Sequence, residues 1–148
     1  MNWRKEAVED LRNYRRRRQS LENMAERRRA LEEAYQALRA AVSAGGDGAD
    51  GVDGVDEVAD GLIECVAQRE RLALNIAAVR RLVRLTERGL NSLDDRQRLV
   101  LERFYIEGGR GHAEWLMERL ACEKSRVYEL KDEALYAFTT AMYGLAES

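Results

Sequence analysis

The 148-residue chain contains no proline, one histidine, two cysteines and few aromatic residues. A single histidine cannot build a histidine-based metal site, and Cys65 and Cys122 lack the short CxxC spacing of zinc ligands. We expect both cysteines to be small buried hydrophobic residues rather than a disulfide pair. The sequence also lacks a glycine-rich phosphate loop and a Ser or Cys nucleophile with a base beside it. We therefore expect neither a cofactor nor enzymatic activity.

Long hydrophobic runs are absent as well. No apolar stretch approaches the roughly 18 residues that a membrane-spanning helix needs, and the N-terminal MNWRKEAVED has no apolar signal region. These features predict a cytoplasmic protein with no membrane partner.

The chain is instead rich in Leu, Ala, Arg and Glu, and 35% of its residues are charged. This composition favours long helices. An apolar heptad predicts a first helix from about Trp3 to Val42, with one seam that needs a partner helix. Arg17 and Arg28 interrupt the seam and are predicted to point at it. Its two columns are Tyr14, Leu21, Tyr35 and Val42, and Met24, Leu31 and Leu38.

Residues 45–61, GGDGADGVDGVDEVADG, hold six acids and six of the eleven glycines. Glycine and aspartate oppose helix continuation, so this segment is predicted to be a flexible acidic loop. A calcium loop is the alternative, but the spacing lacks the alternate aspartates and closing glutamate of an EF-hand.

A second heptad follows the loop, with breaks at Arg69 and Thr86. Its apolar positions are Leu62, Cys65, Leu72, Ile76, Val79, Val83, Leu90 and Leu93. Two seamed helices joined by one loop fold most simply into an antiparallel, coiled-coil-like hairpin, here residues 1–91. The alternative is a homodimer in which each seam meets a second chain, and the sequence does not separate the two.

Arginine is dense on the first helix, in RRRR at 15–18 and RRR at 27–29. One interpretation is a stripe that contacts nucleic-acid phosphates; the other is a solvated face paired with nearby glutamates. The candidate phosphate contacts are Arg15, Arg16, Arg18, Arg27 and Arg29.

Residues 92–148 predict three shorter helices. The first begins near Ser92, as N-cap, and ends at the glycines of 108–111; the second spans about Ala113 to Leu120. Ala121 and Cys122 form a turn, and the third helix runs from Glu123 to about Tyr143, where Gly144 ends it. This is the outline of a helix-turn-helix, whose second helix presents its N-terminal residues to DNA bases. Leu116, Leu120, Cys122, Val127 and Leu130 would point inward. The candidate DNA-binding residues are Lys124, Ser125, Arg126, Tyr128, Glu129 and Lys131.

The stretches SLDDRQRLVLERFYIEGG and AEWLMERLACEKSRVYELKDEAL resemble the C-terminal helix-turn-helix module of sigma-70-type factors, which binds the −35 promoter element. The order of segments is similar to that of ArpU/RinA-type phage transcription regulators. The resemblance covers about residues 92–144 and is only architectural before them. It implies a regulator of phage or prophage late genes in a bacterial host, acting on double-stranded promoter DNA and on RNA polymerase. By the same resemblance, the base-contacting positions fall on Lys124, Ser125, Tyr128 and Glu129.

The charge of the proposed reading helix departs from that pattern. Residues 123–133 carry four acids and three bases, so this helix alone has little electrostatic attraction for DNA. Either the arginines of the first helix supply backbone contacts, or a protein partner brings the module to DNA. We therefore expect an all-α protein with a helical hairpin and a sigma-like module that regulates transcription. The alternatives are a coiled-coil adaptor whose module no longer reads DNA and a DNA-packaging subunit of the small-terminase kind.

Overall fold

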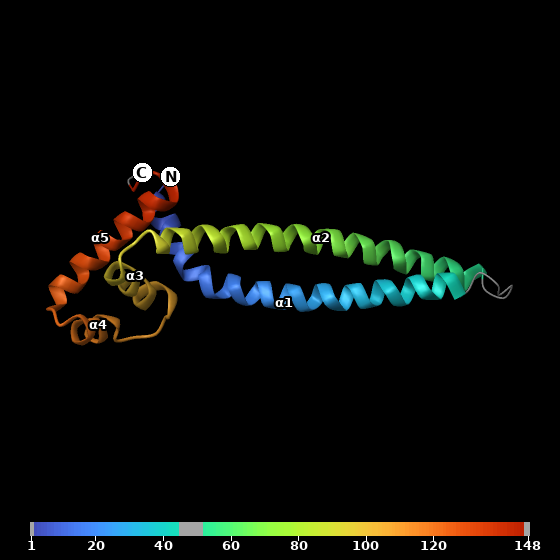
Figure 1. Ribbon diagram of the computed structural model, residues 1–148, viewed down its shortest axis with the longest axis horizontal. Helices are drawn as coiled ribbons and strands as arrows, with labels where there is room; N and C mark the ends of the chain where they lie inside the picture. The colour runs from blue at the N-terminus through green and yellow to red at the C-terminus, as the bar shows by residue number, and fades with distance from the viewer. Residues whose placement is uncertain (1, 45–51, 147–148) are drawn as a thin grey trace. The chain divides into compact units, whose positions relative to one another are not determined.

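The computed structural model describes residues 2–44 and 52–146 of the chain. Within these residues the structure contains helices and no strand, which confirms the predicted all-α class. Two long helices come first, α1 (Trp3–Ala44) and α2 (Val52–Asn91). Three shorter ones follow, α3 (Asp95–Leu101), α4 (His112–Leu120) and α5 (Lys124–Tyr143), with a π-helical turn, η2 (Glu102–Ile106), directly after α3 (Figure 1).

The described helices group into two compact units. Unit 1 comprises residues 1–18 and 81–148, and unit 2 comprises residues 19–80. Each long helix therefore contributes to both units. The boundary that the sequence predicted between residues 91 and 92 does not coincide with this division, because the first turns of α1 and the last turns of α2 belong with the C-terminal helices.

The core of unit 1 explains this grouping. Its larger cluster joins residues from α1, α2, α3 and α5, all nearly or fully buried. Helix α5 carries apolar residues on two faces, so it covers α3 and α4 with one and the ends of the long helices with the other. The members of this cluster are Ala7, Leu11, Leu90, Leu101, Ala134, Leu135 and Phe138.

A second, smaller cluster in unit 1 lies between α3, α4 and the start of α5. It consists of Val100, Ala113, Leu116, Val127 and Leu130. The two successive aromatic residues of η2 pack against different clusters. Phe104 packs against the smaller one, and Tyr105 packs against the larger one.

In unit 2, α1 and α2 run side by side in opposite directions (Figure 1). Three contacts fix the pairing. Gly61 approaches the Leu38 side chain, the Cys65 thiol donates to the Leu31 carbonyl at 3.4 Å, and Arg69 forms an ion pair with Glu32 at 2.5 Å. The residue numbers fall on α1 as they rise on α2, which is the antiparallel order that the two heptads predicted.

The loop prediction for residues 45–61 was too long. Helix α2 begins at Val52, so residues 52–61 are helical, whereas residues 45–51 lie outside the described part of the chain. Glycine and aspartate have weak helix propensity, yet this stretch of the sequence is helical.

The start of α3 also differs from the prediction. Asp94, not Ser92, is the N-cap: its carboxylate accepts from the Gln97 N–H at 2.8 Å, and the Gln97 side chain accepts from the Asp94 N–H at 3.4 Å. This reciprocal pair is a capping box. The Ser92 hydroxyl instead donates to the Gly89 carbonyl at 2.7 Å and helps to end α2.

Candidate nucleic-acid interface

Helices α4 and α5 are separated by a break of three residues. Ala121 has a left-handed backbone with φ of 53°, and the Cys122 N–H donates to the Met117 carbonyl at 3.1 Å. Helix α5 then begins after Glu123, whose side chain makes no capping hydrogen bond. The predicted turn at Ala121 and Cys122 is confirmed, and it is formed without glycine.

Two residues anchor the first turns of α5. Val127 and Leu130 are buried against Leu116 of α4 and Val100 of α3. Leu120 and Cys122 pack against the same cluster at its edge. All five residues that the sequence placed on the inner side therefore contribute to this core.

The opposite side of the same turns faces solvent. Lys124, Ser125, Arg126, Tyr128 and Glu129 are all exposed. Because the anchored residues lie on the other face, this exposed surface is held on a rigid helix, as a reading surface requires. The structure thus brings together five of the six candidate DNA-binding residues.

Lys131, the sixth candidate, lies beside Tyr128 but is less exposed than the other five. It is only half exposed, and its ammonium stands over the rings of Phe104, Tyr105 and Tyr128, at 4.7, 5.5 and 5.5 Å from their centroids. The negative faces of aromatic rings attract a cation, so this lysine stabilises the packing of η2 against α5.

The cations of the exposed surface already have acidic partners. Lys124 forms an ion pair with Glu114 of α4 at 3.8 Å, and Arg126 pairs with Glu129 at 3.1 Å and with Glu133 at 3.4 Å. The hydrogen bond to Glu129, together with the charge of Glu133, raises the pKa of Arg126 above its ordinary value. These pairs are solvent-exposed and therefore weak, so a phosphate or another anion can replace the carboxylates.

The candidate phosphate-contacting arginines divide between the two units, and all are exposed. In unit 1, Arg15 donates to the Glu107 carbonyl at 3.3 Å, Arg18 stands 5.8 Å from the Tyr14 ring centroid, and Arg16 lies beside them on α1. Arg27 and Arg29 belong to unit 2, where they border two different depressions between α1 and α2.

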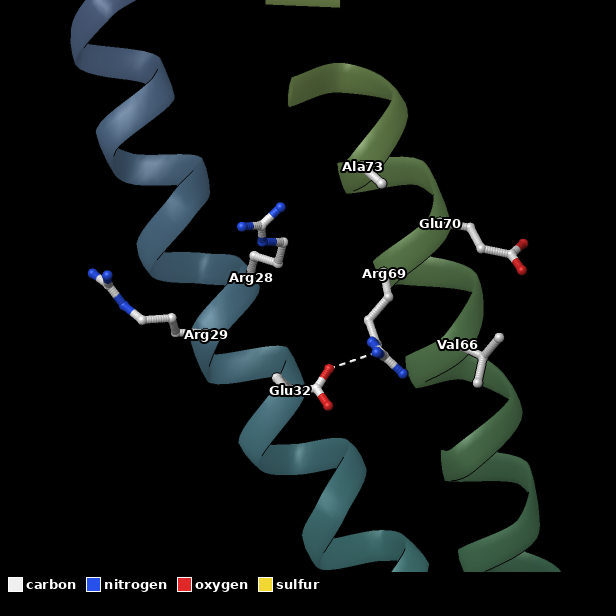
Figure 2. Close-up of a pocket in the computed structure, with 7 residues that line it drawn as sticks. All are labelled: Arg28, Arg29, Glu32, Val66, Arg69, Glu70 and Ala73. Carbon is white, nitrogen blue, oxygen red and sulfur yellow. Dashed lines mark ion pairs between the residues drawn. The ribbon is translucent and has the colours of Figure 1, made fainter. Parts of the chain in front are cut away.

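The two arginines that were predicted to point at the seam behave differently from each other. Arg17 is partly buried in unit 1 and pairs with Asp10 at 2.9 Å, which also accepts a hydrogen bond from the Tyr143 hydroxyl. Arg28 is exposed in unit 2 and lines an open depression with Glu32 and Arg69 (Figure 2).

The breaks in the second heptad have local explanations. Arg69 sits between the two helices of unit 2, where it pairs with Glu32 and lies 4.3 Å from the Tyr35 ring centroid (Figure 2). Thr86 is buried in unit 1, and its hydroxyl is satisfied there because it donates to the Leu82 carbonyl at 3.0 Å. Both polar side chains are thereby satisfied at seam positions.

Sequence reasoning missed a group of residues around Trp115. This tryptophan is partly exposed on α4, and the Arg103 guanidinium lies 4.3 Å from its ring centroid. His112 packs edge-on against Phe104, and its Nδ1 is buried without a hydrogen-bond partner. The available signal was the aromatic content of ERFYI and HAEW, which is high for a chain with so few aromatic residues.

Both cysteines are free thiols, with Cys65 buried and Cys122 partly so. In residues 2–44 and 52–146, no cluster of three His, Cys, Asp or Glu side chains is arranged to hold a metal ion. The helices described there include none with the length and apolar character needed to cross a membrane.

Comparison with known proteins gave no match to a family model, to a curated protein or to a solved structure.

Proposed function

We propose that the protein is a transcriptional regulator of phage or prophage late genes that binds promoter DNA through α5. The observation that supports this proposal best is the two-sided character of the first turns of α5. Val127 and Leu130 anchor the helix, while Lys124, Ser125, Tyr128 and Glu129 face outward after a tight turn. An anchored helix with exposed polar residues at its N-terminal end is the geometry that enters a major groove.

The outward residues have suitable chemistry for base recognition. Lysine can donate to guanine, serine can donate or accept, and glutamate can accept from the amino group of cytosine. Arg126 would contact a phosphate, because its guanidinium can exchange two exposed carboxylates for a phosphate. Arg15, Arg16 and Arg18 would add backbone contacts from unit 1, and Arg27 and Arg29 would add them from unit 2.

A coiled-coil adaptor is the second candidate, and the ion pairs of α5 favour it. Lys124 and Arg126 face three acids, Glu114, Glu129 and Glu133, so this surface is acidic overall. Such a surface repels DNA and suits a basic protein partner. RNA polymerase is the partner that the resemblance implies, and under this alternative the module would bind it without reading DNA.

Selection from random duplex DNA at about 100 mM salt tests the first candidate, because nonspecific phosphate binding is partly suppressed there. We expect the full-length protein to enrich one sequence motif. The variant Lys124→Ala/Arg126→Ala should bind that motif roughly tenfold or more weakly. The slope of the logarithm of its binding constant against the logarithm of the salt concentration should become shallower, by the amount expected for the loss of about one to two phosphate contacts.

Two further variants separate specific contacts from general charge. Arg4→Ala/Lys5→Ala also removes one arginine and one lysine, from an exposed part of α1 in unit 1. This control variant should weaken DNA binding much less than Lys124→Ala/Arg126→Ala. Glu133→Gln removes one carboxylate from Arg126 and should tighten binding. A folded protein that enriches no motif, with Glu133→Gln equally inactive, would reject DNA reading and favour the adaptor.

A further inference from the structure

Helix α2 carries a second apolar surface in unit 2, on the side turned away from α1. The side that contacts α1 contains Cys65, Leu72 and Ile76, all buried. Ile63 and Leu74 are also large and apolar, yet they are 68% and 72% exposed, the highest values among the exposed large hydrophobic side chains of the described residues. An isolated exposed leucine is ordinary, but two on one face of a helix form a surface that a partner can cover.

The spacing puts these two side chains on one line. Ile63 and Leu74 are eleven residues apart, close to three turns of ~3.6 residues, so they point in nearly the same direction. Ala67 lies between them on the same side. Glu70 also falls on this side, and Figure 2 shows its side chain directed away from α1. We name Ile63, Ala67, Glu70 and Leu74 the outer face of α2.

Charged residues at the edge of the outer face are complementary under reversal of the helix. Glu64 and Arg71 lie on the same edge, seven residues apart, and form an exposed ion pair at 3.6 Å within the chain. If a second copy of α2 lies antiparallel across the outer face, residues whose numbers sum to about 136 meet. Glu64 then faces Arg71 of the copy, with a sum of 135, and Ile63 faces Leu74 of the copy, with a sum of 137.

The same register puts the two-fold axis at about residue 68, beside Ala67, which then faces Glu70 of the copy with a sum of 137. A small residue there lets the two helices approach closely, and each favourable contact occurs twice because the interface is isologous. The apolar pair and the charged pair therefore both favour the same antiparallel register.

We propose that the outer face of α2 is a self-association surface, and that two copies of the chain pair antiparallel through it. The partner is a second copy because a reversed α2 sets Arg71 opposite Glu64 in nearly the same register that sets Leu74 opposite Ile63. The seam between α1 and α2 within one chain stays intact in this arrangement. This inference is independent of the proposed DNA binding, and it concerns unit 2 alone.

Light scattering and sedimentation of the full-length protein, without DNA, test the proposal. We expect a dimer whose dissociation is concentration-dependent. Ile63→Glu/Leu74→Glu should weaken association roughly 100-fold or more, because four buried side chains are lost for each dimer. Val42→Glu changes an exposed apolar residue on α1 in the same unit, outside the outer face, and should leave the mass unchanged. Circular dichroism should show full helicity in all three proteins.

Charge exchange gives the sharper experiment. Glu64→Arg alone and Arg71→Glu alone should each self-associate more weakly, because like charges then meet across the two-fold axis. A mixture of the two single variants should associate better than either alone, since each supplies the charge that the other lacks. Glu70→Ala should tighten association by removing the charge from the outer face.

A protein that is monomeric at all accessible concentrations would overturn the proposal. So would a dimer whose mass is unaffected by Ile63→Glu/Leu74→Glu, because the copies would then meet elsewhere. Failure of the two single charge variants to associate with each other would reject the antiparallel register. None of these results depends on DNA, so they leave the test of the proposed function separate.

Discussion

The two units are built from the same two long helices, yet they bury side chains to very different extents. In unit 1, α1 contributes Ala7 and Leu11, both fully buried, to a core shared with three other helices. In unit 2 no described residue of α1 is buried, and among residues 57–80 of α2, whose burial is described, only Cys65, Leu72 and Ile76 are buried.

The difference follows from the number of neighbours around each side chain. Two helices alone touch along one line, so solvent reaches the seam from both sides. A side chain in unit 1 has helices on several sides and can be enclosed. The same heptad sequence therefore gives a shallow contact in unit 2 and a closed core in unit 1, and stability should depend mainly on unit 1.

The largest expected effect on stability comes from shortening one leucine of α1 in each unit. Leu11→Ala, in unit 1, should lower the free energy of unfolding by ~2–5 kcal/mol, because the cavity is fully enclosed. Leu31→Ala, in unit 2, should cost less than half as much, since Leu31 is only half-buried. Chemical denaturation measures both variants.

The chain itself provides probes for the two units. Trp3 and Trp115, the two tryptophans, both lie in unit 1, so tryptophan fluorescence follows that unit, whereas far-ultraviolet circular dichroism follows both. Leu11→Ala should shift the fluorescence transition. Equal costs for the two leucine variants would show that the units are equally well packed and would contradict the comparison.

Glycine substitutions test the same contrast with opposite signs. A Cβ at Gly89, in unit 1, would lie 2.7 Å from Phe138 Cε2 and 2.9 Å from Met142 Sδ, so Gly89→Ala should destabilise the fold by ~1–3 kcal/mol. A Cβ at Gly61, in unit 2, would make only ordinary contact with Leu38 at 3.5 Å. Gly61→Ala should therefore stabilise α2 by ~0.5–1 kcal/mol, the usual gain for alanine inside a helix.

Thermal or chemical unfolding of these two glycine variants, followed by circular dichroism, gives the signs directly. A stabilising Gly89→Ala would mean that Phe138 can move aside, and the core of unit 1 would then be less rigid than its burial indicates. A destabilising Gly61→Ala would mean that the helices of unit 2 are packed as closely as those of unit 1.

The elements of this fold could be predicted because they depend on local patterns. The heptads located the two long helices and favoured an antiparallel order without separating it from a dimer, and the apolar spacing from Leu116 to Leu130 identified the inner side of the C-terminal helices. The left-handed Gly144 ends α5 as its type suggests.

What could not be predicted depends on contacts between distant segments. Ala7 and Leu11 precede the recognisable heptad and make only a short pattern, yet they complete the core of unit 1. The start of α2 at Val52 differs from what its glycines and aspartates indicate, because helix propensity is a weak local preference that packing against another helix can override.

The candidate interface shows the same limit. The spacing of residues on α5 determined which side chains are exposed, but not their partners. Glu114 reaches Lys124 from another helix, and Lys131 lies over three rings supplied partly by η2. Such pairings depend on tertiary packing and rotamers, which a pattern of residue types does not specify.

The smallest expected effect concerns the contact in unit 1 between Tyr143, at the end of α5, and Asp10, near the start of α1. Burial, the hydrogen bond to Asp10 and the charge of Asp10, in that order, raise the pKa of Tyr143 above its ordinary value. A phenol whose pKa is raised in the folded state keeps its proton where the unfolded chain has lost it. Its contribution is therefore complete below about pH 10, the ordinary tyrosine pKa, and disappears as the pH rises through the folded-state value.

Tyr143→Phe should consequently reduce the loss of stability between pH 8 and pH 10.5, as measured by urea unfolding with tryptophan fluorescence. Some loss should remain, because burial also raises the pKa values of Tyr14 and Tyr105 in the same unit.

At neutral pH Tyr143→Phe should be less stable by about 1 kcal/mol, since Asp10 loses one hydrogen-bond donor but keeps Arg17. Tyr35→Phe is the matched change in unit 2 and should leave the fluorescence transition where it is, because both tryptophans report on unit 1. An alkaline loss as large in Tyr143→Phe as in the unmodified protein would show that this contact does not stabilise unit 1 through the phenol proton.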